Sequence, residues 1–176
     1  MKTIIDTKII SLKKPSKNVY DLLLDKKRID DLLPDGHIKG YFLSFEEDME
    51  GILEKGDELD LFLHPVLDED ASLCLELSVL EIVENRKISL VLSGMSKYDE
   101  EKEEWVAMNI YKDFIDGASV EYLFYDNGLN SDIEIITRIE SENLLLRLTL
   151  KIQLLIKKIM PSKFTREFQN KIEKWA

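Results

Sequence analysis

The stretch SLKKPSKNVYDLLLDKKRIDDLLPDG, residues 11–36, decides the fold, because the chain passes there from a strand into two short helices. The preceding segment Thr3–Leu12, which overlaps the start of this stretch, is rich in Ile and Thr and predicts a strand. Ser16 can cap a helix behind Pro15, and apolar residues then follow at helical spacing. A second short helix, Lys26–Leu33, ends at the proline and glycine that close the stretch.

Beyond this stretch the apolar residues alternate with the two-residue period of β-strands. Several such runs are separated by turn sequences, of which Asp116-Gly117 is a strong hairpin signal. The alternation slips at Leu80, which predicts a β-bulge or a strong bend. Hairpin-linked strands of this kind indicate an antiparallel sheet with one buried face.

The segment from Asn143 to the end has the period of an amphipathic helix. An unbroken helix as far as Trp175 would span about 50 Å and would overhang a compact domain of this length. We therefore predict a kink or break at Pro161, with two halves that pack on different parts of the sheet. One sector of the first half holds Leu144, Leu145, Leu148, Ile152, Leu155, Ile156 and Ile159.

This order of elements, and most specifically the opening stretch, resembles the helix-grip fold of the START-related (SRPBCC) superfamily. The resemblance covers essentially all 176 residues as pattern and order. It implies a single ligand-binding domain, residues 1–176, of the α+β class: a curved antiparallel sheet of seven or eight strands wrapped around a long C-terminal helix. Common members have seven strands and we count eight candidates, so either Trp105–Ile115 is an extra strand or two candidates are one.

Composition restricts the classes of function. The chain has a net charge of −11 and a pI near 4.7, which argues against nucleic acid as a partner, because phosphate binding needs a basic surface. The N-terminus lacks the apolar stretch of a signal peptide. Four cations within Leu144–Met160 argue against a membrane-spanning helix. We expect a cytoplasmic protein.

The residues offer little reactive chemistry. His37 and His64 lack the spacing of metal ligands and are expected to be exposed, so no metal site is predicted. Cys74, the single cysteine, excludes an internal disulfide and is expected to be a packed or half-exposed thiol. The many carboxylates of this acidic chain do not single out an acid–base pair. We expect no cofactor.

The resemblance implies a cavity between the sheet and the C-terminal helix that holds a small hydrophobic ligand. Tyr122 is the expected polar anchor, because a buried hydroxyl needs a partner. Ordinary core packing remains the alternative for each position, since a two-residue period does not distinguish a filled core from a hollow one. The expected lining residues are Leu75, Leu77, Leu90, Met108, Tyr122, Ile135, Leu148, Ile152 and Leu155.

Two other functions stay open. One is an enzyme of the cyclase or aromatase kind in the same cavity, for which we find no inward His or Lys. The other is a protein-interaction module acting through an acidic surface. Residues 147–176 carry a net charge of +6, so the first 146 residues total −17, and this part suits a basic partner.

A second apolar stripe of the C-terminal helix is bordered by cations. It predicts a surface, the 146–158 face, for peripheral contact with an anionic membrane or for a homodimer. Alternatively, the opening helices cover it through Val19, Leu23 and Leu32. The expected contact residues are Leu146, Leu150, Leu154, Arg147, Lys151 and Lys158.

Overall fold

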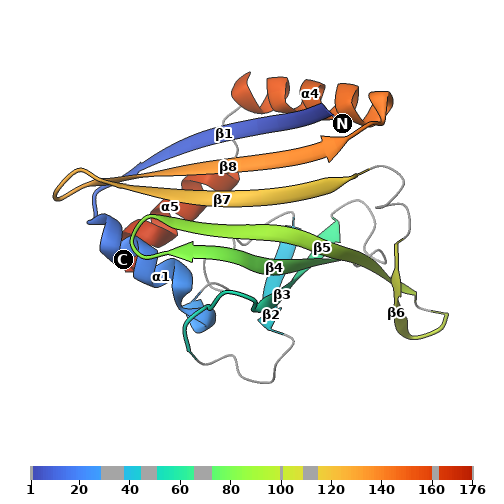
Figure 1. The fold of residues 1–176 in the computed structure, drawn as a ribbon, viewed down its shortest axis with the longest axis horizontal. Helices are drawn as coiled ribbons and strands as arrows, with labels where there is room; N and C mark the ends of the chain where they lie inside the picture. Colours follow the sequence, from blue (N-terminus) through green and yellow to red (C-terminus); the bar gives the residue numbers. More distant parts are fainter. Residues whose placement is uncertain are drawn as a thin grey trace.

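The computed structural model of the chain describes residues 2–28, 38–44, 51–65, 73–99, 101–108, 115–159 and 163–175. These ranges form an α+β structure in which helices pack against a curved antiparallel sheet (Figure 1). The elements are β1 (Lys2–Leu12), α1 (Ser16–Leu24), β2 (Ile38–Ser44), β3 (Glu58–Pro65), β4 (Leu73–Val83), β5 (Lys87–Asp99), β6 (Glu104–Ala107), β7 (Gly117–Asp126), β8 (Ser131–Ser141), α4 (Leu144–Ile159) and α5 (Lys163–Trp175).

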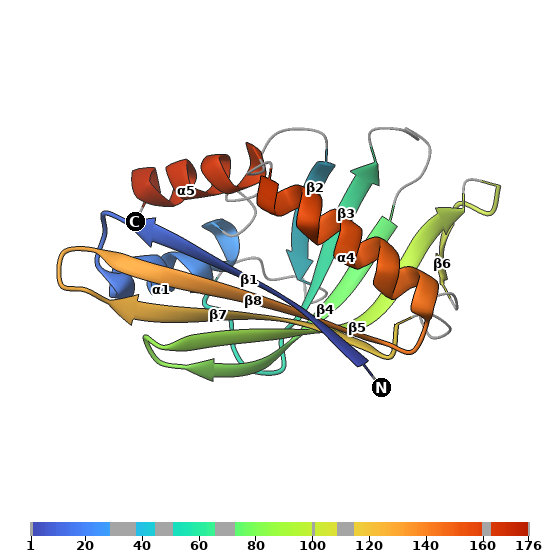
Figure 2. The same ribbon diagram turned by 90° about the horizontal axis from the view of Figure 1, so that it is seen from above.

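The sheet has eight strands, seven of them in the continuous order β1-β8-β7-β5-β4-β3-β2. The eighth, β6, pairs with the end of β5 alone and lies off this path, so the run from Trp105 does contain an extra strand. Figure 2 shows β2 and β3 running across the direction of β1 and β8, which reflects the curvature of the sheet. The irregularity predicted at Leu80 is confirmed, because the β4–β5 register shifts between Val79 and Glu81.

The opening stretch forms the predicted strand and first helix. Pro15, rather than Ser16, occupies the position before α1, and no side chain caps the helix. Ser16 is instead a buried residue of the first turn. Helical backbone resumes at residues 26–28, and the remainder of the predicted second helix lies outside the described residues.

The hydrophobic core lies at one end of the sheet, where α1 and α5 pack together against its inner face. We use inner face for the side of the sheet that contacts these two helices. Tyr20 of α1 meets Phe124 of β7 edge-on, with ring centroids 5.3 Å apart. The fully buried side chains of Val19, Ile133 and Ile172 join α1, β8 and α5 in one cluster.

The C-terminal segment forms two helices rather than one long one. α4 ends at Ile159 and α5 begins at Lys163, which confirms the predicted division; Pro161 itself lies outside the described residues. α4 contacts β1 and β8, whereas α5 contacts α1 and β1. The two halves therefore pack on different parts of the molecule (Figure 2).

Candidate functional site

The inner face of the sheet carries both fully buried and half-buried apolar side chains. Leu90 is part of the core with Phe124 and Ile133. Leu77, Tyr122 and Ile135 are only partly buried at the edge of that core. Leu90, one of the predicted lining residues, is thus a packing residue. Three other predicted lining residues, Leu77, Tyr122 and Ile135, lie at the edge of the core and are only partly buried.

Strand register joins these half-buried residues into rows. Tyr122 of β7 lies between Ile88 of β5 and Ile135 of β8. On β4, Leu75 lies two residues from Leu77 and so shares its face, and it is also half-buried. The structure therefore places Leu75, Leu77, Tyr122 and Ile135 on the same face of the sheet, with the buried pair Val79–Leu90 between the Tyr122 row and Leu77.

Tyr122 is the polar member of this surface. Within the described part of the chain its hydroxyl has no hydrogen-bond partner, and burial raises the pKa of the phenol. Ionisation is therefore disfavoured, and at neutral pH the side chain can donate and accept a hydrogen bond. This environment is compatible with the anchoring role that the sequence predicts for it.

A cation that the sequence did not predict lies at the end of the same row. Lys8 of β1 is paired with Ile135 in the β1–β8 register. It is half-buried and shares its side of β1 with the core residues Ile10 and Leu12. The expectation that no lysine takes an inward position is therefore wrong. The sequence could have revealed this position, because Lys8, Ile10 and Leu12 are spaced two residues apart and therefore share one face of the strand.

Met108 lies at the far end of the sheet from α1. Its backbone N–H donates to the carbonyl of Met95, 2.8 Å away, and Met95 is the register partner of Leu75. Met108 also borders an open pocket of about 530 Å³ at the β5–β6 hairpin. The pocket is lined by Lys97, Tyr98, Asp99, Glu101, Val106, Ala107 and Met108, so it is more polar than the surface around Tyr122.

The first turns of α4 have the reverse of the predicted orientation. Leu148, expected to face inward, is 56% exposed. Leu146, Arg147 and Leu150, expected on a contact surface, are half-buried, whereas Lys151 is exposed. Both stripes of this helix are apolar, so hydrophobic periodicity alone does not determine which one faces β1 and β8. The side chains of Ile152, Leu154, Leu155 and Lys158 lie outside the described part of the chain.

A polar cluster occupies the opposite, outer face of the sheet. Ser96 Oγ donates a 2.7 Å hydrogen bond to Glu76 Oε1, and a Cβ at position 94 would collide with the Glu76 carboxylate, so Gly94 makes room for it. The Cys74 thiol donates to the carboxyl group of Asp60. Sequence reasoning missed this cluster because its members come from three strands.

The cluster is poorly suited to nucleophilic catalysis. Burial, together with the charge of Asp60, raises the pKa of Cys74 to about 12, so the thiol stays protonated at neutral pH. Burial also raises the pKa of Asp60, and its Oδ1 has no hydrogen-bond partner. The predicted packing of Cys74 is confirmed, since it is a buried free thiol.

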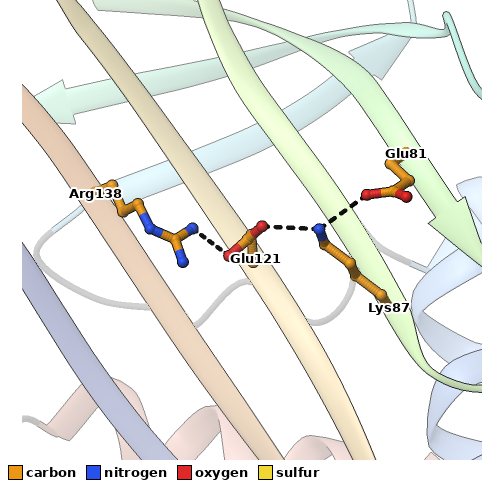
Figure 3. A network of polar contacts seen from close by, with 4 residues as sticks. All are labelled: Glu81, Lys87, Glu121 and Arg138. Atoms are coloured by element: carbon orange, nitrogen blue, oxygen red, sulfur yellow. Dashed lines mark hydrogen bonds and ion pairs between the residues drawn. The ribbon is translucent and has the colours of Figure 1, made fainter.

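A chain of ion pairs crosses four strands on the outer face (Figure 3). Lys87 Nζ lies 2.8 Å from Glu81 Oε2 and 2.9 Å from Glu121 Oε1, and Glu121 also pairs with Arg138. Hydrogen bonds from Lys87 and Arg138 lower the pKa of Glu121. Because the four residues belong to β4, β5, β7 and β8, the network links four neighbouring strands of the sheet.

The described residues contain neither a metal-binding cluster nor a membrane-spanning helix. Among them, no group of three His, Cys, Asp or Glu side chains could hold a metal ion. Of the helices in the same ranges, none is long and apolar enough to cross a bilayer. His37 and the side chain of His64 lie outside the described part.

Comparison with known proteins identifies the fold. Neither a family model nor a curated protein matches the sequence. Among solved structures, Ara h 8.0201 is similar, with a TM-score of 0.62, 10% identity and coverage of 98% of this chain and 99% of that one. A START superfamily protein from Mycobacterium smegmatis has a TM-score of 0.61 at 12% identity, covering 98% and 99% of the two chains.

Norcoclaurine synthase from Thalictrum flavum is a third similar structure, with a TM-score of 0.60, 10% identity and coverage of 98% of this chain and 86% of that one. These similarities extend over nearly the whole chain. The protein therefore has the helix-grip fold of START-related proteins, as the order of its elements predicts. Identities of 10–12% demonstrate the fold and not a shared activity.

Proposed function

We propose that residues 1–176 form a single domain that binds a small, mostly apolar molecule on the half-buried inner surface around Tyr122. The observation that carries this proposal is a half-buried apolar surface that includes the hydroxyl of Tyr122, which has no partner among the described residues. Apolar side chains left half-buried forgo part of the stabilisation that full burial would provide. A ligand that covers them recovers this stabilisation on binding.

The difference in burial among the inner-face residues supports the proposal. α1 and α5 cover part of the inner face and supply the core together with the strands, and half-buried apolar residues remain at the edge of that core. Leu75, Leu77 and Ile135 are its apolar contacts in the proposed site, with Met108 at its border. Leu90 is excluded from the lining because it lies in the core, and Leu148 because it is exposed.

The polar groups of the site suggest the chemistry of the ligand. Tyr122 and Lys8 flank Ile135 in one cross-strand row, so their backbones are about 10 Å apart across two strand spacings. A hydroxyl and an ammonium group on the same face of the sheet suit an apolar molecule that ends in a carboxylate or carbonyl group. Fatty-acid-like molecules are the simplest members of this class.

Binding of the fluorescent fatty acid cis-parinaric acid tests the proposal. We expect saturable binding by the wild-type chain and about 5-fold weaker binding by Tyr122→Phe, the loss of one hydrogen bond. Tyr125→Phe is the matched control, because that hydroxyl donates to Glu134 on the outer face. Leu75→Trp should block the site without altering the core.

Native mass spectrometry provides the independent measurement. An apolar adduct that co-purifies with the wild-type chain and is absent from Leu75→Trp would support the proposal. Absence of any adduct, together with no binding of the probe, would contradict it. Equal affinity of wild type and Tyr122→Phe would remove Tyr122 from the anchoring role.

A further inference from the structure

We propose that α4 docks on an anionic lipid bilayer through Leu144, Leu145 and Leu148, which we call the leucine face. These side chains are 73%, 74% and 56% exposed, although they lie in the first two turns of a helix packed on the sheet. Three adjacent exposed leucines form a contiguous apolar surface, which marks an interaction site more often than isolated exposed residues do. This inference does not depend on the proposed ligand site.

The geometry of α4 separates this face from the one that contacts the sheet. At 100° per residue, the three leucines span an arc of about 100°. The half-buried Leu146 and Leu150 lie on the opposite side of the helix, toward its contacts with β1 and β8. In Figures 1 and 2, α4 lies along the edge of the sheet beside β1, so its far side borders the outside of the molecule.

The charges favour a bilayer with anionic headgroups over other occupants. The α4 sequence LLLRLTLKIQLLIKKI contains four cations and no acidic residue, and exposed Lys151 and half-buried Arg147 border the leucine face. Apolar side chains flanked by Lys and Arg are typical of helices that lie in a membrane interface. A second copy of the chain would bring another cationic α4 against this one, which is unfavourable.

The charge distribution also orients the molecule. The first 146 residues have a net charge of −17, and residues 147–176 have +6. An anionic surface repels the former and attracts the latter, so the chain approaches with its C-terminal helices foremost. Attraction by the cations and insertion of the leucines then act at the same place.

Co-sedimentation of the full chain with vesicles tests this inference. We expect binding to vesicles of 70% phosphatidylcholine and 30% phosphatidylserine, and at least 10-fold weaker binding to pure phosphatidylcholine. The double variant Leu144→Ser/Leu145→Ser should lose at least 10-fold in affinity, with an unchanged melting temperature because both side chains are exposed. The matched control is Leu129→Ser at the β7–β8 turn, which is 85% exposed and should bind as wild type does.

Several outcomes would overturn the inference. These are no binding of the wild type to the anionic vesicles, equal loss in Leu129→Ser, or a melting temperature lowered in the double variant. A dimer in sedimentation velocity that the double variant abolishes would assign the leucine face to a second copy instead. Loss of cis-parinaric acid binding in the double variant, with vesicle binding intact, would assign it to the ligand site.

Discussion

Asp60 is a carboxylate that the fold keeps away from water on the outer face of the sheet. Its pKa is raised by burial, so the charged form is disfavoured and Asp60 destabilises the fold increasingly as the pH rises through that pKa. We predict that Asp60→Asn increases the free energy of unfolding at pH 7 by about 1 kcal/mol. The gain should shrink as the pH falls, because protonation of the wild-type side chain removes the cost of burying its charge.

Urea unfolding at pH 7 and pH 4 measures this difference. Asp116→Asn is the control, because Asp116 is exposed and should change stability little at either pH. A variant less stable than the wild type at pH 7 would mean that the Asp60 charge is compensated by contacts beyond those described.

Individual residues show what the sequence could reveal and what it could not. The packing of Cys74 follows from its place within a strand. The inward position of Lys8 follows from its two-residue spacing from Ile10 and Leu12. The Asp60 environment was out of reach, because it depends on which residues of β3, β4 and β5 are paired. Register is a long-range property that local alternation does not specify.

At the scale of elements, the ion-pair network across β4, β5, β7 and β8 links stability to pH. The pKa of Glu121 is lowered by hydrogen bonds from Lys87 and Arg138, so this contribution is present above the ordinary glutamate pKa, about 4.3, and is lost as pH falls through the lower folded value. We predict that Glu121→Gln lowers the free energy of unfolding at pH 7 by about 1 kcal/mol, discounted for partial exposure of the network.

The loss should shrink as the pH falls through the lowered pKa of Glu121 and the wild-type carboxylate becomes protonated, and it should decrease in high salt. Thermal unfolding followed by circular dichroism measures both effects. Asp21→Asn, which breaks the exposed Lys17–Asp21 pair on α1, is the control and should cost less stability than Glu121→Gln does. An equal loss in both variants would show that the network adds nothing beyond a surface pair.

Elements were predicted better than their orientations. The order of strands and helices, the bulge in β4 and the division of the C-terminal segment all follow from local pattern. The rotation of α4 does not, because both of its stripes are apolar. The half-burial of Leu146 and the exposure of Leu148 depend on where β1 and β8 lie relative to the helix axis.

For the whole molecule, the class of fold could be predicted because order and period are sequence properties. How far the inner face is filled could not be predicted, because that depends on where α1 and α5 pack together against the sheet. The half-buried surface around Tyr122 lies at the edge of the core that these helices form with the strands. The candidate site is therefore a product of the arrangement of elements, and single positions in the sequence do not specify it.

This arrangement predicts that the chain unfolds as one cooperative unit. Its two tryptophans report on distant parts: Trp105 lies on β6, and Trp175 lies in α5. In single-tryptophan variants, Trp105→Phe and Trp175→Phe, fluorescence and far-ultraviolet circular dichroism should give the same urea midpoint. Ile172→Ala removes a side chain that is 0% exposed in the core and should cost about 2–5 kcal/mol.

Because the core joins α1, α5 and strands from across the sheet, the loss caused by Ile172→Ala should shift both tryptophan transitions equally. Leu80→Ala, at an exposed position of β4, is the control and should move neither by more than about 0.5 kcal/mol. If only the Trp175 signal shifted, α5 would unfold separately from the sheet. The division of the C-terminal segment would then mark a boundary between independent units, contrary to a single domain over residues 1–176.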